Sequence, residues 1–138
     1  MKVVKQRSTC PISTSLDVLG DRWTLLILRD MVFAGKSTYG EFLQSAEKIA
    51  TNVLADRLAV LESQGLITKA VASDKKSKFI YRLTEKGVDT IPIIVALIQW
   101  GIKHCPTDVN PDLLEELQAG KEAVVEKYQR LAREKALV

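Results

Sequence analysis

The sequence has few of the residues on which catalysis and metal binding usually depend. It holds one histidine, His104, and two cysteines, Cys10 and Cys105. A single histidine cannot build a metal site of several histidines, and neither an activated nucleophile nor a glycine-rich phosphate loop is apparent. Two cysteines are too few for a secreted fold held by disulfides, which favours a reducing compartment. We therefore expect no enzyme, no metal and no cofactor, and the expected chemistry is binding.

Long apolar stretches are lacking as well. The longest, residues 91–98, is far shorter than the roughly 20 residues that span a bilayer. The basic residues 1–7 are not followed by the apolar segment of a signal peptide. The chain has 138 residues, of which 46% are apolar and 27% charged, so we expect one soluble domain over residues 1–138 in the cytoplasm, with no membrane partner. The net charge of +3 permits a polyanionic partner without requiring one.

The order of predicted elements between residues 38 and 87 is the most informative feature of the chain. Thr38 and Glu41 form the pattern of a capping box at the start of a helix, and Gly65 ends a second helix. A polar segment then separates two stretches rich in β-branched and aromatic residues, which predicts a hairpin. We predict a helix, a second helix, two strands and a further helix over residues 39–45, 51–65, 66–72, 78–83 and 85–103. This order indicates a winged helix-turn-helix, a mainly α fold with a small β-hairpin wing.

Further helices are predicted around this core of about residues 21–87. Asp21 is placed to cap a helix that Gly35 ends. Asn110, Pro111 and Asp112 supply a cap, a proline at the first position and an acid in the first turn. The additional helices are expected over residues 13–19, 22–34, 112–117 and 121–135.

The second helix of the pair has two different faces. Leu54, Leu58 and Leu61 share one narrow stripe at about 100° per residue, and we expect this stripe to pack in the core. The opposite side is small and polar, and it carries Asn52, Asp56, Ala59 and Ser63. Such a side suits a helix that lies in a groove of double-stranded DNA, which would associate the protein with the nucleoid.

We predict DNA contacts from this helix, from the hairpin and from the start of the preceding helix. Asn52 can pair with adenine or a phosphate, and Thr51 with a phosphate. Lysines at the hairpin tip would reach the flanking backbone or minor groove, although lysines in a turn can also simply be solvated. The predicted contact residues are Lys36, Ser37, Thr38, Thr51, Asn52, Val53, Asp56, Arg57, Lys75, Lys76 and Lys78.

Two of these residues leave an alternative open. Asp56 would repel phosphates unless it accepts a hydrogen bond from a cytosine or pairs with a nearby lysine. Arg57 lies nearer the edge of the core, so it either contacts DNA or braces Glu62 or a neighbouring helix. Residues 36–38 precede a helix N-terminus, a place where backbone amides bind phosphates.

The helix predicted over residues 85–103 is apolar on nearly every side, and Pro92 is expected to bend it. A helix of this kind must be buried all round. The expected cover is the same helix of a second copy, in a two-fold interface that includes Ile94, Leu97, Ile98 and Trp100. The alternative is that the charged C-terminal helices fold back over it. We expect dimerisation elements at about residues 10–20 and 88–138.

Cys10 precedes Pro11 at the start of the first predicted helix, with Lys5 and Arg7 upstream. A helix N-terminus and nearby cations favour the thiolate, which is the reactive form of cysteine. Cys10 is therefore a candidate redox sensor, and the alternative is an ordinary free thiol.

Several sequence motifs resemble the HxlR-type family of bacterial winged-helix regulators, which are relatives of the MarR group. They are Cys10-Pro11, LGDRWTLLIL from residue 19, YGEF from 39, LADRL from 54, LE from 61, GLI from 65, YRLTEKG from 81 and QWG from 99. The resemblance implies a homodimeric transcription factor that binds an inverted repeat and dimerises through the C-terminal helices and the first helix, where Leu16 lies. In some members of the family a cysteine at the place of Cys10 senses electrophiles or oxidants.

The predicted function is therefore that of a homodimeric DNA-binding regulator of transcription, responsive to an oxidant or a small molecule. Two rival functions stay open at this point. The first is a winged-helix module that holds another protein and has no affinity for DNA. The second is a thiol-dependent enzyme using Cys10, which is disfavoured because no base or oxyanion stabiliser accompanies the cysteine.

Overall fold

A computed structural model of the chain describes residues 4–72 and 75–136, without the side chains of residues 75–77. Its elements in chain order are α1 Pro11–Leu19, α2 Arg22–Phe33, α3 Tyr39–Leu43, α4 Thr51–Ser63, β1 Ile67–Ala72, β2 Lys75–Leu83, α5 Glu85–Val88, α6 Ile91–His104, α7 Pro111–Ala119 and α8 Lys121–Ala136. The prediction of a mainly α fold with one β-hairpin is confirmed.

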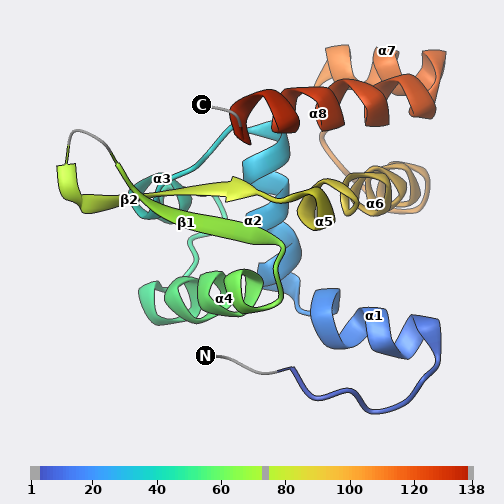
Figure 1. Cartoon of the computed structure of the whole chain (residues 1–138). Helices are drawn as coiled ribbons and strands as arrows, with labels where there is room; N and C mark the ends of the chain where they lie inside the picture. Colours follow the sequence, from blue (N-terminus) through green and yellow to red (C-terminus); the bar gives the residue numbers. More distant parts are fainter. Residues whose placement is uncertain (1–3, 73–74, 137–138) are drawn as a thin grey trace.

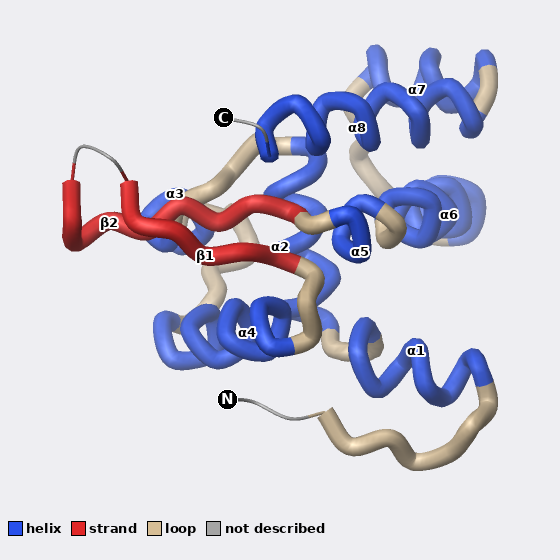
Figure 2. The backbone as a smooth tube through the Cα atoms, in the orientation of Figure 1, coloured by secondary structure: helices blue, strands red, loops and turns tan. Residues whose placement is uncertain are grey.

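Helix α2 runs through the centre of the molecule and contacts α4, α6 and α8 (Figure 1). Figure 2 shows the hairpin extending away from the helices on one side, with α1 at the opposite lower corner. Leu28 of α2, Leu54 of α4 and Ile91 of α6 are fully buried in a core shared by these helices and the base of the hairpin. Apolar burial of this extent drives the helices together.

Local capping interactions begin the helices where the sequence predicts them. The Asp21 carboxylate accepts a hydrogen bond from the Thr24 amide at 3.0 Å, and Thr38 forms a complete capping box with Glu41. Thr84 caps α5, and Asn110 caps α7. These side chains satisfy backbone amides that the first turn of a helix leaves without partners.

Strands β1 and β2 pair antiparallel, with Val71 opposite Phe79 and Lys69 opposite Tyr81. Gly65, at φ +77°, ends α4 and turns the chain into β1, a conformation that favours glycine. The Tyr81 amide donates to the Ser37 carbonyl at 2.7 Å, which fixes the segment before α3 against the hairpin. The hairpin and the helix-turn-helix are therefore held as one unit.

The single helix predicted over residues 85–103 is wrong, because the chain forms α5 and α6 with a break at Asp89 and Thr90. Pro92 has no amide hydrogen and cannot donate to the Val88 carbonyl one turn earlier. That carbonyl instead accepts from Gln129 Nε2 of α8 at 3.5 Å, and Thr90 Oγ1 donates to the Gly87 carbonyl at 2.6 Å. The expected bend at the proline is thus a separation into two helices.

The C-terminal helices fold back onto the rest of the chain. Helix α8 contacts α5, α6 and β2, and it buries Val124. The Phe33 and Tyr128 rings lie 4.5 Å apart, and Arg133 Nη2 pairs with Glu85 at 3.0 Å. The alternative in which the tail covers α6 therefore holds for one side of that helix.

The opposite side of α6 stays uncovered in the single chain. Leu97 is 51% exposed and Trp100 is 62% exposed, with Ile93 also exposed and Ile98 half-buried. Ile94 is only 5% exposed, because it faces the core. The expectation that Ile94 lies in an interface is therefore corrected.

Candidate nucleic-acid interface

Helix α4 presents its first turn to solvent and its leucines to the core. Leu54, Leu58 and Leu61 are buried as predicted, whereas Thr51 and Asn52 are exposed. Figure 1 shows the first turn of α4 on the same side of the molecule as the outer end of the hairpin. A helix fixed by its apolar stripe keeps its polar residues in one defined direction.

An open cleft of about 680 Å³ lies between α3, α4 and the hairpin. Lys69 of β1 and Lys78 of β2 line it from the hairpin, and both are exposed. The Lys69 ammonium lies 4.2 Å from the centroid of the Phe79 ring, a cation–π distance. Sequence reasoning missed Lys69, although the predicted strand contained it, because its side of the hairpin depends on the pairing register.

Two glutamates also line the cleft, and they differ in their surroundings. The Glu41 carboxylate accepts from the Ser37 amide at 3.0 Å and from the Thr38 amide at 3.1 Å. These backbone hydrogen bonds, first that of Ser37, hold the pKa of Glu41 below its ordinary value. Its negative charge is therefore engaged at the helix N-terminus, whereas Glu62 is exposed on the α4 wall.

The predicted contact residues before α3 are partly engaged within the protein. The Lys36 ammonium lies 3.5 Å from the Asp30 carboxylate of α2, which directs it away from the cleft. The Ser37 amide and the Thr38 hydroxyl take part in the cap with Glu41. This placement argues against a phosphate contact by Lys36.

The remaining predicted residues of α4 and the hairpin differ in exposure. Val53 is half-buried and packs against the core. Asp56 Oδ2 accepts from Arg57 Nη1 at 3.0 Å, so its carboxylate is engaged by an arginine of the same helix. The side chains of Lys75 and Lys76 lie outside the described part of the structure, and their predicted contacts stay predictions.

Arg57 reaches α2 and does not face the cleft. Its Nε and Nη2 atoms donate to the two oxygens of Asp21 at 2.8 and 3.1 Å. This hydrogen bonding lowers the pKa of Asp21 and raises the pKa of Arg57. Of the two alternatives for Arg57, the structure favours the brace to a neighbouring helix, and the predicted DNA contact is corrected.

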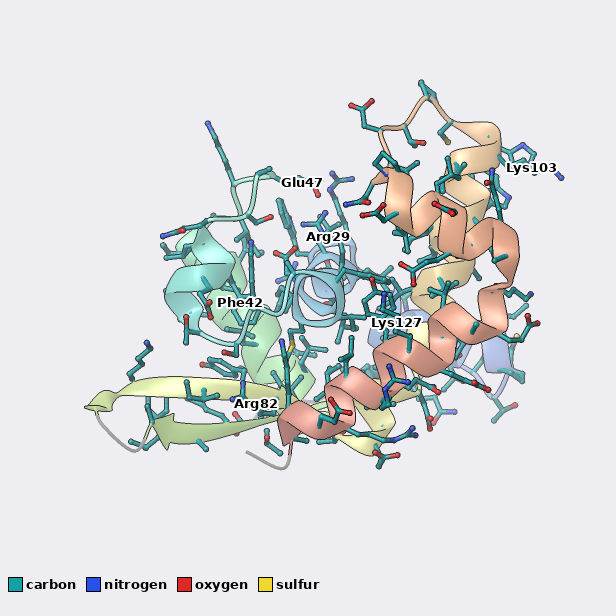
Figure 3. The ribbon with its side chains drawn as sticks, turned by 90° about the horizontal axis from the view of Figure 1, so that it is seen from above. Arg29, Phe42, Glu47, Arg82, Lys103 and Lys127 are labelled. Atoms are coloured by element: carbon teal, nitrogen blue, oxygen red, sulfur yellow. The ribbon has the colours of Figure 1, made fainter. Side chains whose placement is uncertain are left out.

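A second ionic contact joins α2 to the turn between α3 and α4. Glu47 pairs with Arg22 at 2.6 Å and with Arg29, whose Nη2 also donates to Ser45 at 3.1 Å. Figure 3 shows Arg29 and Glu47 meeting beside α2. The hydrogen bond from Arg29 is the largest cause that lowers the pKa of Glu47. The helix-turn-helix is therefore attached to α2 both before α4, at Glu47, and in the middle of α4, at Arg57.

Both cysteines are exposed, and Cys10 is the N-terminal cap residue of α1, where its amide donates to Ser8 Oγ at 3.2 Å. In the described residues, no cluster of histidine, cysteine and acidic side chains is placed to hold a metal. None of the helices described is both long and apolar enough to cross a bilayer.

The arrangement of α2, α3, α4 and the following hairpin defines a winged helix-turn-helix protein. Comparison with known families gives a match to the HxlR-like helix-turn-helix family over residues 18–109, and the chain belongs to that family.

Curated relatives and a solved structure agree with this assignment. The chain is 32% identical over 114 residues to the HTH-type transcriptional regulator YdeP of Bacillus subtilis, which covers 83% of this chain and 84% of YdeP. It is 35% identical over 102 residues to an HTH-type transcriptional regulator of Mycobacterium bovis, covering 74% of this chain and 63% of the relative's length. The oxidised form of the redox regulator HypR superposes with a TM-score of 0.62 at 30% identity, over 72% of this chain and 100% of HypR.

Proposed function

We propose that this protein is a homodimeric transcriptional regulator that binds double-stranded DNA at an inverted repeat. The exposed first turn of α4, beside the lysine-lined cleft, is the observation that carries the proposal. Thr51 and Asn52 enter the major groove, where Asn52 pairs with an adenine edge or a phosphate. Two copies present these turns about one helical repeat (~34 Å) apart.

The cleft receives the sugar–phosphate backbone that separates the major groove from the flanking minor groove. Lys69 and Lys78 stand on the hairpin wall of this cleft, where their charges neutralise phosphates. Lys75 and Lys76 extend this contact to the minor groove from the end of the wing. Because phosphates are common to all sequences, these lysines contribute affinity and little base preference.

The second copy covers the apolar residues that a single chain leaves exposed. Leu16 of α1 is 61% exposed, and Leu97 and Trp100 of α6 are similarly open. Ile12 and Ile93 extend this surface, and Ile98 lies half-buried at its edge. Exposed apolar surface on two neighbouring helices is typical of a subunit interface.

Cys10 gives the regulator a means to respond to oxidants. It is exposed at the N-terminus of α1, within the element proposed to dimerise. HypR, a structural neighbour, is named a redox regulator. Oxidation or alkylation of Cys10 would change α1 and so the DNA affinity.

Diamide treatment should alter DNA binding by the wild type and leave Cys10→Ser unchanged, and an equal response in both would remove the sensor role. A small molecule in contact with α1 is an alternative effector.

The base-reading role is tested by selecting duplexes from a random library with the wild-type protein. Asn52→Ala should change the preferred base at one position in each half-site, at a cost of about 1–3 kcal/mol for the original base. Gln118→Ala, at an exposed position of α7, is the matched control and should select the wild-type sequence.

The wing lysines are tested on the same duplexes. Lys75→Ala combined with Lys76→Ala should weaken binding by a similar factor on every sequence, because phosphates carry no base identity. If no duplex is enriched above the input by the wild type, the DNA-binding proposal fails and a protein-binding module takes its place.

A further inference from the structure

We propose that the Asp21–Arg57 ion pair is the positioning contact that fixes the recognition helix α4 relative to α1, and thereby sets the half-site spacing that the dimer accepts. The inference rests on the proposed function and deepens it. Asp21 and Arg57 lie 36 positions apart in the sequence, and neither faces the cleft.

The Asp21 carboxylate takes part in two interactions at once, the N-terminal cap of α2 and the ion pair with Arg57 of α4. Asp21 Oδ2 accepts from the Thr24 amide at 3.0 Å and from Arg57 Nε at 2.8 Å, while Oδ1 accepts from Arg57 Nη2 at 3.1 Å. Asp56 occupies the third nitrogen of Arg57, so the guanidinium cannot rotate freely. A bidentate arginine–carboxylate pair defines direction as well as distance. The α2 N-terminus and the middle of α4 are thus joined at a fixed angle.

The same carboxylate stands directly after α1. Only Gly20 and Asp21 separate the end of α1 at Leu19 from the start of α2 at Arg22. The Gly20 amide donates to the Leu16 carbonyl at 2.8 Å, and an added Cβ at position 20 would lie 2.5 Å from that oxygen. The link is therefore short and tightly folded, so that a rotation of α1 should also move Asp21.

Within the single chain, helix α1 is attached mainly at its C-terminal end, where Val18 and Leu19 pack against the core. It has no buried residue of its own, and Ile12 and Leu16 point to solvent. In the proposed dimer the second copy fixes α1, the Gly20–Asp21 link fixes the end of α2, and Arg57 fixes α4. The distance between the two recognition helices then follows from this chain of contacts.

The test measures spacing preference as well as affinity. The probe is the duplex that the wild type selects from a random library, remade with the spacer between half-sites shortened or lengthened by one and two base pairs, together with a duplex carrying one half-site. Arg57→Gln should reduce the ratio of best to worst spacer affinity by about fivefold or more, within the range of measured pairwise couplings. The affinity for the duplex with a single half-site should change less than about twofold, which is close to the scatter of such measurements.

A matched control uses a second bidentate arginine pair among the described residues. Arg133 donates to both oxygens of Glu85 and so joins α8 to α5. Arg133→Gln removes a pair of the same chemistry and should keep the wild-type spacer profile. Arg57→Lys restores the charge without the fork and should lie between the wild type and Arg57→Gln.

Asp21→Asn provides a second variant that keeps the helix cap, because asparagine caps as well as aspartate. It should flatten the spacer profile in the same direction as Arg57→Gln, with circular dichroism reporting the fold of each variant. An unchanged spacer profile in the folded variants overturns the inference, as does an equal loss of affinity on every probe, which indicates a structural role alone. A wild type that binds no duplex removes the proposed function and the inference together.

Discussion

The helix-turn-helix and the surface formed by α1 and α6 differ in how completely one chain covers their apolar residues. In α4 the leucine stripe is closed by α2 and the hairpin, and Leu54 has no exposed surface. In α1 and α6, Leu16 and Trp100 are more than half exposed. The apolar side chains of the first region are buried within a single chain, whereas the second region exposes apolar surface to water, which is unfavourable. The DNA-facing unit should therefore fold without a partner, and the partner should decide how two such units are placed.

The largest effect should follow from a cavity in the buried core of the helix-turn-helix. Leu54→Ala removes a fully buried side chain and should lower the free energy of unfolding by about 2–5 kcal/mol. Leu131→Ala, on the exposed side of α8, is the control and should cost less than about 0.5 kcal/mol. Thermal and denaturant unfolding measure both values. Equal losses would mean that the core of the helix-turn-helix is not closed by the single chain.

Negative charge on the exposed apolar side of α6 should separate the two subunits of the proposed dimer without unfolding them. Leu97→Glu combined with Trp100→Glu places two carboxylates where the second copy is proposed to pack, so sedimentation should give a monomer with unchanged helix content. Loss of the second half-site should reduce operator affinity by about 100-fold, or roughly 2.7 kcal/mol. Leu131→Glu adds a charge outside this surface and should stay dimeric. A dimeric double variant would exclude this side of α6 from the interface.

Sequence reasoning succeeded where the causes are local and failed where they are distant. Asp21, Thr38 and Asn110 cap the helices next to them, and such caps can be recognised within a few residues. The Asp21–Arg57 pair could not be recognised, because it depends on how α4 packs against α2. For the same reason the sequence left Arg57 open between a DNA contact and a brace to a neighbouring helix.

The C-terminal half shows the same limit. The apolar run from residue 91 indicated a buried helix, but the pattern could not say which side the tail would cover and which a second copy would cover. The packing of α6 on α2 and α8 places Ile94 in the core and leaves Leu97 exposed. The sequence predicted a bend at Pro92. The full break at Thr90 depends on a distant residue, because Gln129 of α8 donates the hydrogen bond to the Val88 carbonyl that Pro92 cannot donate.

A smaller effect should follow from removing charge in the cleft. Lys69→Ala combined with Lys78→Ala removes four phosphate contacts from the proposed dimer and should reduce the slope of log affinity against log salt by about 3.6, since each contact contributes about 0.9. At fixed salt the loss should be similar on all sequences. Lys121→Ala combined with Arg130→Ala removes the same charge from α8 and should leave the slope unchanged. A slope that falls equally in both pairs would mean that only net charge, and not the cleft, matters.

The smallest effect concerns acid pH and compares the two ionic contacts that attach the helix-turn-helix to α2. Arg57 holds the pKa of Asp21 below its ordinary value, so the unfolded state binds more protons as the carboxyl titrates. The stabilisation is therefore complete above the ordinary carboxyl pKa and is lost as pH falls through the lowered one. Arg57→Gln should lose less stability than the wild type between about pH 5 and pH 2. Glu47→Gln should also reduce the loss, because Arg29 lowers the pKa of Glu47 in the same direction. Since these side chains are partly exposed and screened, both differences should be small, and they should add in the double variant if the two contacts act independently.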